Sequence, residues 1–327
     1  MNRLFSLALA TSAVALMSFT AAEAQTVTLR LSNVTTQAGK DGGVYFIEKV
    51  KEATKGEVII EHYPDNQLGD DRTVVESTIF GDIDLVVSST TPMATIFPDF
   101  NMFDAPFLFL SLDAVYKGLD GEIGQKVLAE MEGKGLVGLA WWENGFRNFT
   151  NNKVAAKVPD DVKSMKIRVM QSDVQMAAWA AIGVNPTPIA FTELFTAMQQ
   201  GTVDGQENPL QIIDGNKFQE VQKYLSLTQH GYVPFVLCMN PAKFKSLKKE
   251  HQDAIVNAAK ESVEWQRNRV HEQDAVIINK VQKEGMTVVE LTPEQKALWQ
   301  QKVIDGKVYD LVKSKMEHPE YFDAMVK

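Results

Sequence analysis

One arginine is placed by its sequence context where a buried charge would need a partner. Residues 165–170 alternate as in a strand, with Arg168 on one face near the strand's end and three apolar residues on the other, namely Met165, Ile167 and Val169. In a sheet covered on both faces, this guanidinium is costly to bury unless an anion pairs with it. Its planar fork matches a carboxylate with two parallel hydrogen bonds. The pattern predicts either a site for a ligand carboxylate or an internal salt bridge to Asp or Glu, and composition favours neither.

Other side chains suited to holding a small polar ligand lie in the middle of the chain. Arg147 is flanked by apolar residues within 141–152, so we expect it to be partly buried. Asn208 can donate and accept hydrogen bonds at the end of its own predicted strand. Phe191 and Trp142 could form an apolar wall, although such aromatic residues more often belong to the hydrophobic core.

Motifs of common catalytic sites are absent from the sequence. It contains no Gly-x-Ser-x-Gly, no His-Glu-x-x-His and no Gly-x-x-x-x-Gly-Lys. No two histidines stand at metal-ligand spacing; they are His62, His230, His251, His271 and His318. We expect His251 and His271 to be solvated on a helix, whereas His230 could reach a cleft or be structural. The sequence therefore predicts a protein that is not an enzyme and that has no catalytic residue, metal or cofactor.

The first part of the chain alternates between strand and helix patterns. Residues 27–31 and 58–60 are typical of strands, and the apolar residues of 44–53 recur at helical spacing. A helix over 74–80 and a strand over 83–87 follow. This order predicts an α/β fold with a mainly parallel sheet and helices on both of its faces.

One local pattern occurs twice, about 120 residues apart. In residues 80–90 and again in 200–209, a helix ends at a Gly, a short turn follows, and a strand ends in small polar residues. Ligands of open α/β sheets bind beyond the carboxyl ends of strands. The repetition predicts two similar lobes, each contributing a strand end to a shared cleft.

A long segment without Gly or Pro indicates an unusual helix. Residues 247–284 carry apolar residues at spacings of four or seven, with Ser246 as a candidate N-cap and Gly285 as a candidate C-cap. Such a helix would be roughly 50 Å long, more than one small domain. It is interpreted as a strut across both lobes, with a kinked helix or a coiled-coil segment as alternatives. A last helix begins at Thr292, with Pro293 at its first position and Gln295 completing a capping box.

The N-terminal segment predicts export, and the composition limits the possible partners. Arg3, an apolar run and the small-x-small sequence at residues 22–24 predict a secretory signal peptide over residues 1–24. No later apolar run reaches the roughly 20 residues of a membrane span, so we expect no stable membrane insertion. The net charge of −9 argues against nucleic acid as a partner. The single cysteine, Cys238, excludes an internal disulfide and lies in an apolar run that predicts burial.

Several blocks in the same order carry a resemblance to a known family. They are residues 68–72, 103–109, 166–169, 203–209 and 218–228. Together they are similar to the DctP-type solute-binding components of TRAP transporters, over about residues 28–285. The resemblance implies a two-lobed periplasmic-binding-protein fold of type II-like architecture, with a hinge and a long helix spanning both lobes. With it, we assign residues 25–146 plus 234–274 to lobe I and residues 147–233 plus 275–327 to lobe II.

The resemblance also implies roles for residues of this sequence. Arg168 looks like the family's carboxylate-pairing arginine, Arg147 resembles a second arginine of many members, Asn208 the asparagine that also holds the carboxylate, and Phe191 the ring beside it. The first-lobe positions that would read the rest of the ligand are Asp71, Ser89, Thr90 and, as a weaker match, Asn33. Ser89 stands where sialic-acid-binding members carry Glu, which disfavours a large polyol acid of that kind.

The function implied is periplasmic capture of a small organic acid anion and its delivery to the small and large membrane subunits of a TRAP transporter. A C4-dicarboxylate, a sugar acid and a 2-oxo or hydroxy acid all offer the same carboxylate, so the ligand stays open. A ligand sensor for a receptor kinase, the binding protein of an ATP-driven transporter and a periplasmic enzyme are the alternatives. The motif blocks disfavour the second, and the missing catalytic motifs disfavour the third.

Overall fold

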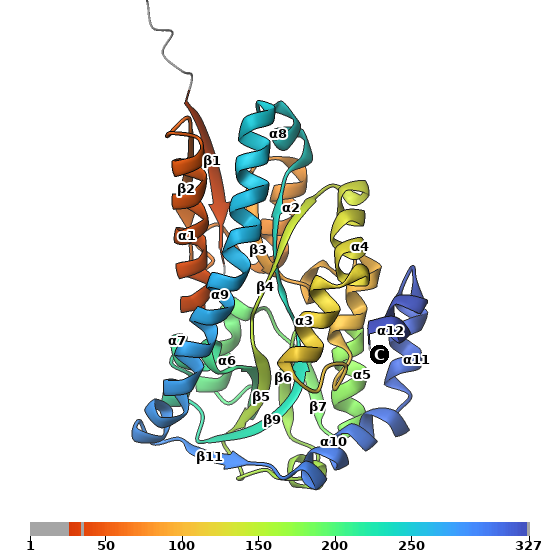
Figure 1. Cartoon of the computed structure of the whole chain (residues 1–327). Coiled ribbons are helices and arrows are strands. Elements are labelled where there is room, and N and C mark those ends of the chain that lie inside the picture. Colours follow the sequence, from red (N-terminus) through yellow and green to blue (C-terminus); the bar gives the residue numbers. More distant parts are fainter. Residues whose placement is uncertain (1–25, 34–35, 326–327) are drawn as a thin grey trace, which may run out of the picture.

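The computed structural model describes residues 26–33 and 36–325, which form two lobes, each built around one β-sheet (Figure 1). The predicted signal peptide, residues 1–24, lies outside the described residues. Within the described residues, no helix combines the length and the apolar character that crossing a bilayer requires.

The first sheet has the strand order β2-β1-β3-β10-β4. Its strands are β1 (Val27–Ser32), β2 (Val58–Tyr63), β3 (Leu85–Ser89), β4 (Val137–Trp142) and β10 (Phe235–Met239). β1, β2 and β3 are parallel, as the β-α rhythm predicts, but β10 is antiparallel to both β3 and β4. β10 enters this sheet directly from the other lobe and therefore runs in the opposite direction, which the pattern of the first ninety residues cannot indicate.

The second sheet has the order β11-β9-β5-β8-β6-β7. Its strands are β5 (Phe146–Asn151), β6 (Lys166–Val169), β7 (Asn185–Pro188), β8 (Gly205–Pro209), β9 (Tyr224–Tyr232) and β11 (Thr287–Glu290). β5 is antiparallel to β8 and β9, while β6, β7 and β8 are parallel. In each sheet all strands but one run in the same direction, so both sheets are mainly parallel, as predicted, with β10 and β5 as the antiparallel strands. Gly205 permits β8 to lie so close to β5, because a Cβ there would stand 2.2 Å from the Thr150 carbonyl oxygen.

Helices cover both sheets. They are α1 (Gln37–Ala53), α2 (Asp71–Phe80), α3 (Leu112–Asp120), α4 (Glu122–Glu130), α5 (Asp173–Ile182), α6 (Leu194–Gln199), α7 (Leu210–Gly215), α8 (Pro241–Ser246), α9 (Lys249–Lys283), α10 (Pro293–Asp305), α11 (Val308–Lys315) and α12 (Pro319–Met325). Short 3-10 segments are η1 (Thr91–Met93), η2 (Pro98–Asp104), η3 (Met131–Lys134), η4 (Pro159–Val162), η5 (Phe191–Glu193) and η6 (Phe218–Glu220).

The repeated glycine pattern has the predicted local structure in both lobes. Gly81 caps α2 with φ of 89°, and Gly201 follows α6 with φ of 70°, a left-handed conformation that glycine adopts without strain. β3 and β8 begin a few residues later. The two strands end at Ser89 and Pro209, on the sides of the lobes that face each other across the cleft described below.

The long helix α9 connects the two lobes. It contacts α1 and β4 of the first lobe and α7 and β11 of the second, as Figure 1 shows. It begins after Lys248 and not after Ser246, which ends α8 and donates its hydroxyl to the Lys243 carbonyl. Gly285 follows its last residues with φ of 103°. Two short chain crossings, residues 143–145 and 233–234, also join the sheets.

The hydrophobic cores follow this division. One cluster lies between the first sheet, α1 and α9, another between the second sheet, α7 and α9, and the largest joins strands of both sheets to α10, α11 and α12. Cys238 is buried, as predicted, but His251 corrects its prediction: it is 3% exposed and its Nε2 lies 3.1 Å from a Glu57 carboxylate oxygen. The residue boundaries assigned to the lobes stay a prediction.

Candidate ligand-binding cleft

A cleft lies where the two lobes meet and encloses about 670 Å³ of space, including its open mouth. The ends of strands and the first turns of helices, from both lobes, form its walls. The residues that line it are Asn66, Asp70, Asp71, Arg72, Ser89, Pro92, Asn144, Arg147, Arg168, Met170, Gln171, Ile189, Ala190, Phe191, Asn208, Ile212 and Phe235. Six of the predicted site residues are among them: Arg168, Arg147, Asn208, Phe191, Asp71 and Ser89.

Arg168 is a buried cation that forms no ion pair with a described residue. It lies on β6 between Ile167 and Val169 and is 2% exposed. Its Nε donates to the Ile189 carbonyl at 2.9 Å, while its buried Nη1 has no hydrogen-bond partner among the described residues. No carboxylate oxygen of a described residue lies within 4.0 Å, so the alternative of an internal salt bridge is not what the structure contains.

Burial makes the positive charge of Arg168 energetically costly. Removal from water lowers the pKa of the guanidinium to about 10, which keeps it protonated at neutral pH but makes that charge costly. The guanidinium carbon lies 6.0 Å from the centroid of the Phe191 ring, which provides a weak cation–π contact. An unpartnered charge of this kind is a ready-made receptor for an anion.

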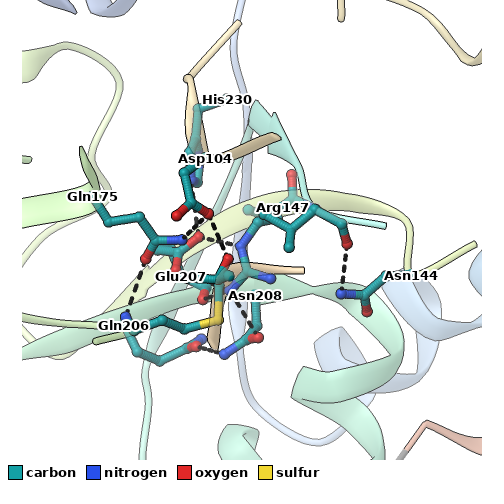
Figure 2. Close-up of polar contacts among 12 residues, drawn as sticks. Asp104, Asn144, Arg147, Gln175, Gln206, Glu207, Asn208 and His230 are labelled. Atoms are coloured by element: carbon teal, nitrogen blue, oxygen red, sulfur yellow. Dashed lines mark hydrogen bonds and ion pairs between the residues drawn. The ribbon is translucent and has the colours of Figure 1, made fainter. Parts of the chain in front are cut away.

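Arg147, on β5, is buried to the same extent but is already neutralised. Its Nε and Nη2 donate to the two carboxylate oxygens of Glu207 on β8, at 2.5 and 2.9 Å (Figure 2). His230 lies 3.1 Å from the same carboxylate and 2.7 Å from the Thr228 hydroxyl. Burial alone would raise the pKa of Glu207, but the Arg147 charge and these hydrogen bonds outweigh burial and lower the pKa to about 2.

Asn208 is held in a fixed orientation by this pair. Arg147 Nη2 donates to its Oδ1 at 3.0 Å, and its Nδ2 donates to Gln206 Oε1 at 2.5 Å (Figure 2). A carboxamide nitrogen carries two N–H groups, and Gln206 uses one of them. Asn208 lines the same cleft as Arg168, and the hydrogen bond from Arg147 sets the orientation of its carboxamide.

The opposite wall carries carboxylates and a hydroxyl. Asp70 caps α2 by accepting from Thr73 N at 2.9 Å, and Asp71 begins the helix beside it. Ser89 Oγ, at the end of β3, donates to Asp71 Oδ2 at 3.4 Å. Burial raises the pKa of Asp71 to about 6, with Asp70 acting in the same direction and the Arg168 charge opposing it.

Three predicted site residues do not line the cleft. Thr90 is fully buried, and Trp142 belongs to the core under the first sheet, where its Nε1 donates to Ser262 Oγ at 2.9 Å. Asn33 donates to the Gly39 carbonyl at 2.9 Å and lies 3.1 Å from the His62 Nε2. The side chains of Thr90 and Trp142 are packed inside the first lobe, and Asn33 orients the start of α1 instead of reaching the gap.

Asn144, which lies in a crossing between the lobes, lines the cleft but is not among the predicted site residues. Its Nδ2 donates to the Val233 carbonyl of the other crossing at 3.0 Å, whereas its buried Oδ1 has no partner among the described residues (Figure 2). Met170, Gln171 and Ile212, which follow β6 and β8, line the cleft and were not predicted either. Their position after predicted strand ends was the one signal that could have found them.

The chain matches a family model described as bacterial extracellular solute-binding protein, family 7 (DctP), over residues 33–310. It is 39% identical to the 2,3-diketo-L-gulonate-binding periplasmic protein YiaO of Escherichia coli K12, covering 75% of this chain and 74% of that protein. It is 31% identical to the C4-dicarboxylate-binding periplasmic protein DctP of Rhodobacter capsulatus, covering 85% and 84%. A TRAP periplasmic solute-binding protein of Polaromonas sp. JS666, solved with D-erythronate, has 37% identity and a TM-score of 0.86, covering 92% of this chain and 98% of that one.

Proposed function

From the premise that this chain belongs to the DctP family of TRAP solute-binding proteins, we propose that Arg168 captures the carboxylate of a small organic acid in the cleft. The single observation that carries the proposal is the buried Nη1 of Arg168, which has no partner among the described residues. A planar carboxylate can accept two parallel hydrogen bonds from the guanidinium and offset the cost of burying it.

The neighbouring side chains have supporting roles in this proposal. The free N–H of Asn208 donates to the same carboxylate, Phe191 covers the guanidinium, and Arg147 positions Asn208. Asp71 and Ser89, from the other lobe, contact the rest of the ligand. Because the ligand touches both lobes, it favours the form in which they are closed, by the difference between its affinities for the closed and open forms.

The proposed setting is the periplasm, reached through the predicted signal peptide. In that setting, the closed form docks on the small and large membrane subunits of a TRAP transporter and releases the anion to them. The protein has no catalytic role in this cycle. A C4-dicarboxylate and a sugar acid are the two ligand classes in question, since related proteins are named for diketogulonate and for C4-dicarboxylates.

Isothermal titration calorimetry with a panel of sugar acids and C4-dicarboxylates tests the proposal. Arg168→Ala should weaken the binding of every acid that the wild type binds by about 2–5 kcal/mol, because it removes one partner of a buried charge pair. This corresponds to a loss of affinity of at least about thirtyfold. The matched control is Arg269→Ala on α9, an arginine outside the cleft that pairs with Asp41 at 2.8 Å. Equal affinities in wild type and Arg168→Ala would refute the proposal.

A further inference from the structure

The two walls of the cleft offer opposite chemistry to a ligand. The wall from the second lobe presents the Arg168 cation, whereas the wall from the first lobe presents the carboxylate of Asp71, and the neighbouring Asp70 carboxylate accepts from Thr73 N as the cap of α2. Asp71 has no Lys or Arg nitrogen within 4.0 Å among the described residues, and its hydrogen bond from Ser89 is long, at 3.4 Å. A ligand that spans the cleft therefore meets a hydrogen-bond acceptor at its far end.

A second acceptor in the cleft is also unsatisfied. The Oδ1 of Asn144 is buried without a partner among the described residues, and its orientation is fixed because Nδ2 donates to Val233 (Figure 2). An amide oxygen gains nothing from an approaching carboxylate and needs an O–H or N–H donor. The acceptors of Asn144 and Asp71 together require a ligand that carries several donors.

We infer that this cleft selects polyhydroxylated monocarboxylates over dicarboxylates, and that Asp71 is the residue that determines this specificity. The inference rests on the proposed function, because Arg168 must first fix the carboxylate end. The hydroxyl groups of a sugar acid then donate to Asp71 and to Asn144, and a hydrogen bond to an ionised acceptor is among the stronger ones in proteins. A second carboxylate in the same place faces a like charge and supplies no donor.

Besides Arg168 and the Glu207-paired Arg147, Arg72 also lines the cleft, and its charge could favour a second carboxylate. Its Nε pairs with Glu76 at 3.3 Å on the exposed side of α2, and half of its side chain is exposed. A charge that is already paired and hydrated attracts a further anion weakly. The acid at Asp71, which is partly buried and forms no ion pair with a described Lys or Arg, therefore dominates at the far wall.

Two pairs of acids isolate this effect, because each pair differs only in a terminal hydroxymethyl group or carboxylate: erythronate with meso-tartrate, and galactonate with galactarate. Calorimetry at pH 8 keeps Asp71 ionised, since its pKa is about 6. In at least one pair, the wild type should bind the monocarboxylate tenfold to a hundredfold more tightly, as for a hydrogen bond to a charged group, at about tenfold per 1.4 kcal/mol.

Asp71→Asn should remove most of that preference by weakening the sugar acid and strengthening the dicarboxylate. The matched control is Asp70→Asn, which deletes the same charge one residue away and keeps an N-cap, because Asn caps helices as well as Asp. It should leave the preference largely intact. The inference is overturned if the wild type prefers the dicarboxylates, or if Asp71→Asn changes both members of a pair equally.

Arg168→Ala separates this inference from the function on which it rests. Loss of binding to all four acids in that variant, together with an unchanged preference in Asp71→Asn, would overturn the specificity inference alone. Unchanged affinities in Arg168→Ala would overturn the proposed function as well, and so would a wild type that binds none of the four acids.

Discussion

Arg147 and Arg168 lie on the two strands that flank β8, and each is 2% exposed, yet their surroundings differ in one respect. Arg147 donates two hydrogen bonds to the Glu207 carboxylate, whereas Arg168 donates to a backbone carbonyl and its Nη1 has no partner in the part of the chain that the structure describes. Burial alone therefore does not identify a binding residue. The balance of charge around each guanidinium does, because a paired cation stabilises the fold and an unpaired one waits for an anion.

This difference also gives the two arginines different proposed roles in the cleft. Arg147 is fixed by Glu207 and in turn fixes the carboxamide of Asn208, so in the proposed function it acts on the ligand through another residue. Arg168 is held at Nε by Ile189, which aims the rest of its fork at the cleft. A single strand, β8, supplies both the acid that neutralises Arg147 and the amide that we propose holds the ligand together with Arg168.

The largest expected effect comes from breaking the buried ion pair between Arg147 and Glu207. Glu207→Gln should lower the free energy of unfolding by about 3–5 kcal/mol, since it leaves Arg147 buried without a counter-charge. Urea denaturation followed by circular dichroism measures this change. Glu76→Gln, which breaks an exposed pair with Arg72, is the control and should cost no more than about 1 kcal/mol. If both variants were equally stable, the contrast between the two arginines would be wrong.

Replacing Arg168 should change the stability in the opposite direction. Arg168→Met should raise the free energy of unfolding of the ligand-free protein by about 1–3 kcal/mol, because it removes a buried donor that lacks a partner. The wild type should gain about 2.7 kcal/mol from a bound acid at 100 times its Kd, and the variant should gain nothing. Thermal unfolding with and without ligand measures both effects. A destabilised ligand-free variant would mean that Arg168 has an internal anion.

Two carboxyl groups extend the contrast to pH. The pKa of Glu207 is lowered from 4.5 to about 2, so its contribution to stability is present above pH 4.5 and is lost as pH falls through 2. The pKa of Asp71 is raised from 3.8 to about 6, so its contribution is present below pH 3.8 and is lost as pH rises through 6. Each slope is at most about 1.4 kcal/mol per pH unit.

Unfolding free energies measured between pH 8 and 2 should show both slopes in the ligand-free wild type. Asp71→Asn should lack the gain between pH 6 and 4, although Asp70 and Arg168 remain near that position, and Glu207→Gln should lack the loss below pH 4.5. A profile of Asp71→Asn that is parallel to the wild type across pH 4–6 would contradict the burial of that carboxyl group.

A third arginine gives the smallest expected effect and sharpens the comparison. Arg72 lines the same cleft but is half exposed and pairs with Glu76 four residues on. Arg72→Ala should lower stability by only about 0.3–0.5 kcal/mol and leave the affinity for a sugar acid nearly unchanged. Calorimetry and urea denaturation of this variant check both values. A loss of binding like that of Arg168→Ala would show that exposure does not weaken this cation.

Local patterns determined much of this protein. The alternation around Arg168 placed it on the face of β6 opposite two buried neighbours, Gly81 and Gly201 ended their helices as predicted, and the capping box at Thr292 begins α10. The long run without Gly or Pro became α9. These features depend on backbone geometry and side-chain periodicity within a few residues, and such information is fully present in the sequence.

The contacts between residues that are far apart in the sequence follow from the tertiary structure. Glu207 neutralises Arg147 across sixty residues, Asn144 reaches the cleft from a crossing, and Trp142 and Asn33 turn into the first lobe. The antiparallel direction of β10 follows in the same way from its return from the other lobe. Local periodicity says which face of a strand a side chain takes. Strand order and register, which set its partner, arise from packing between elements that are far apart in the chain.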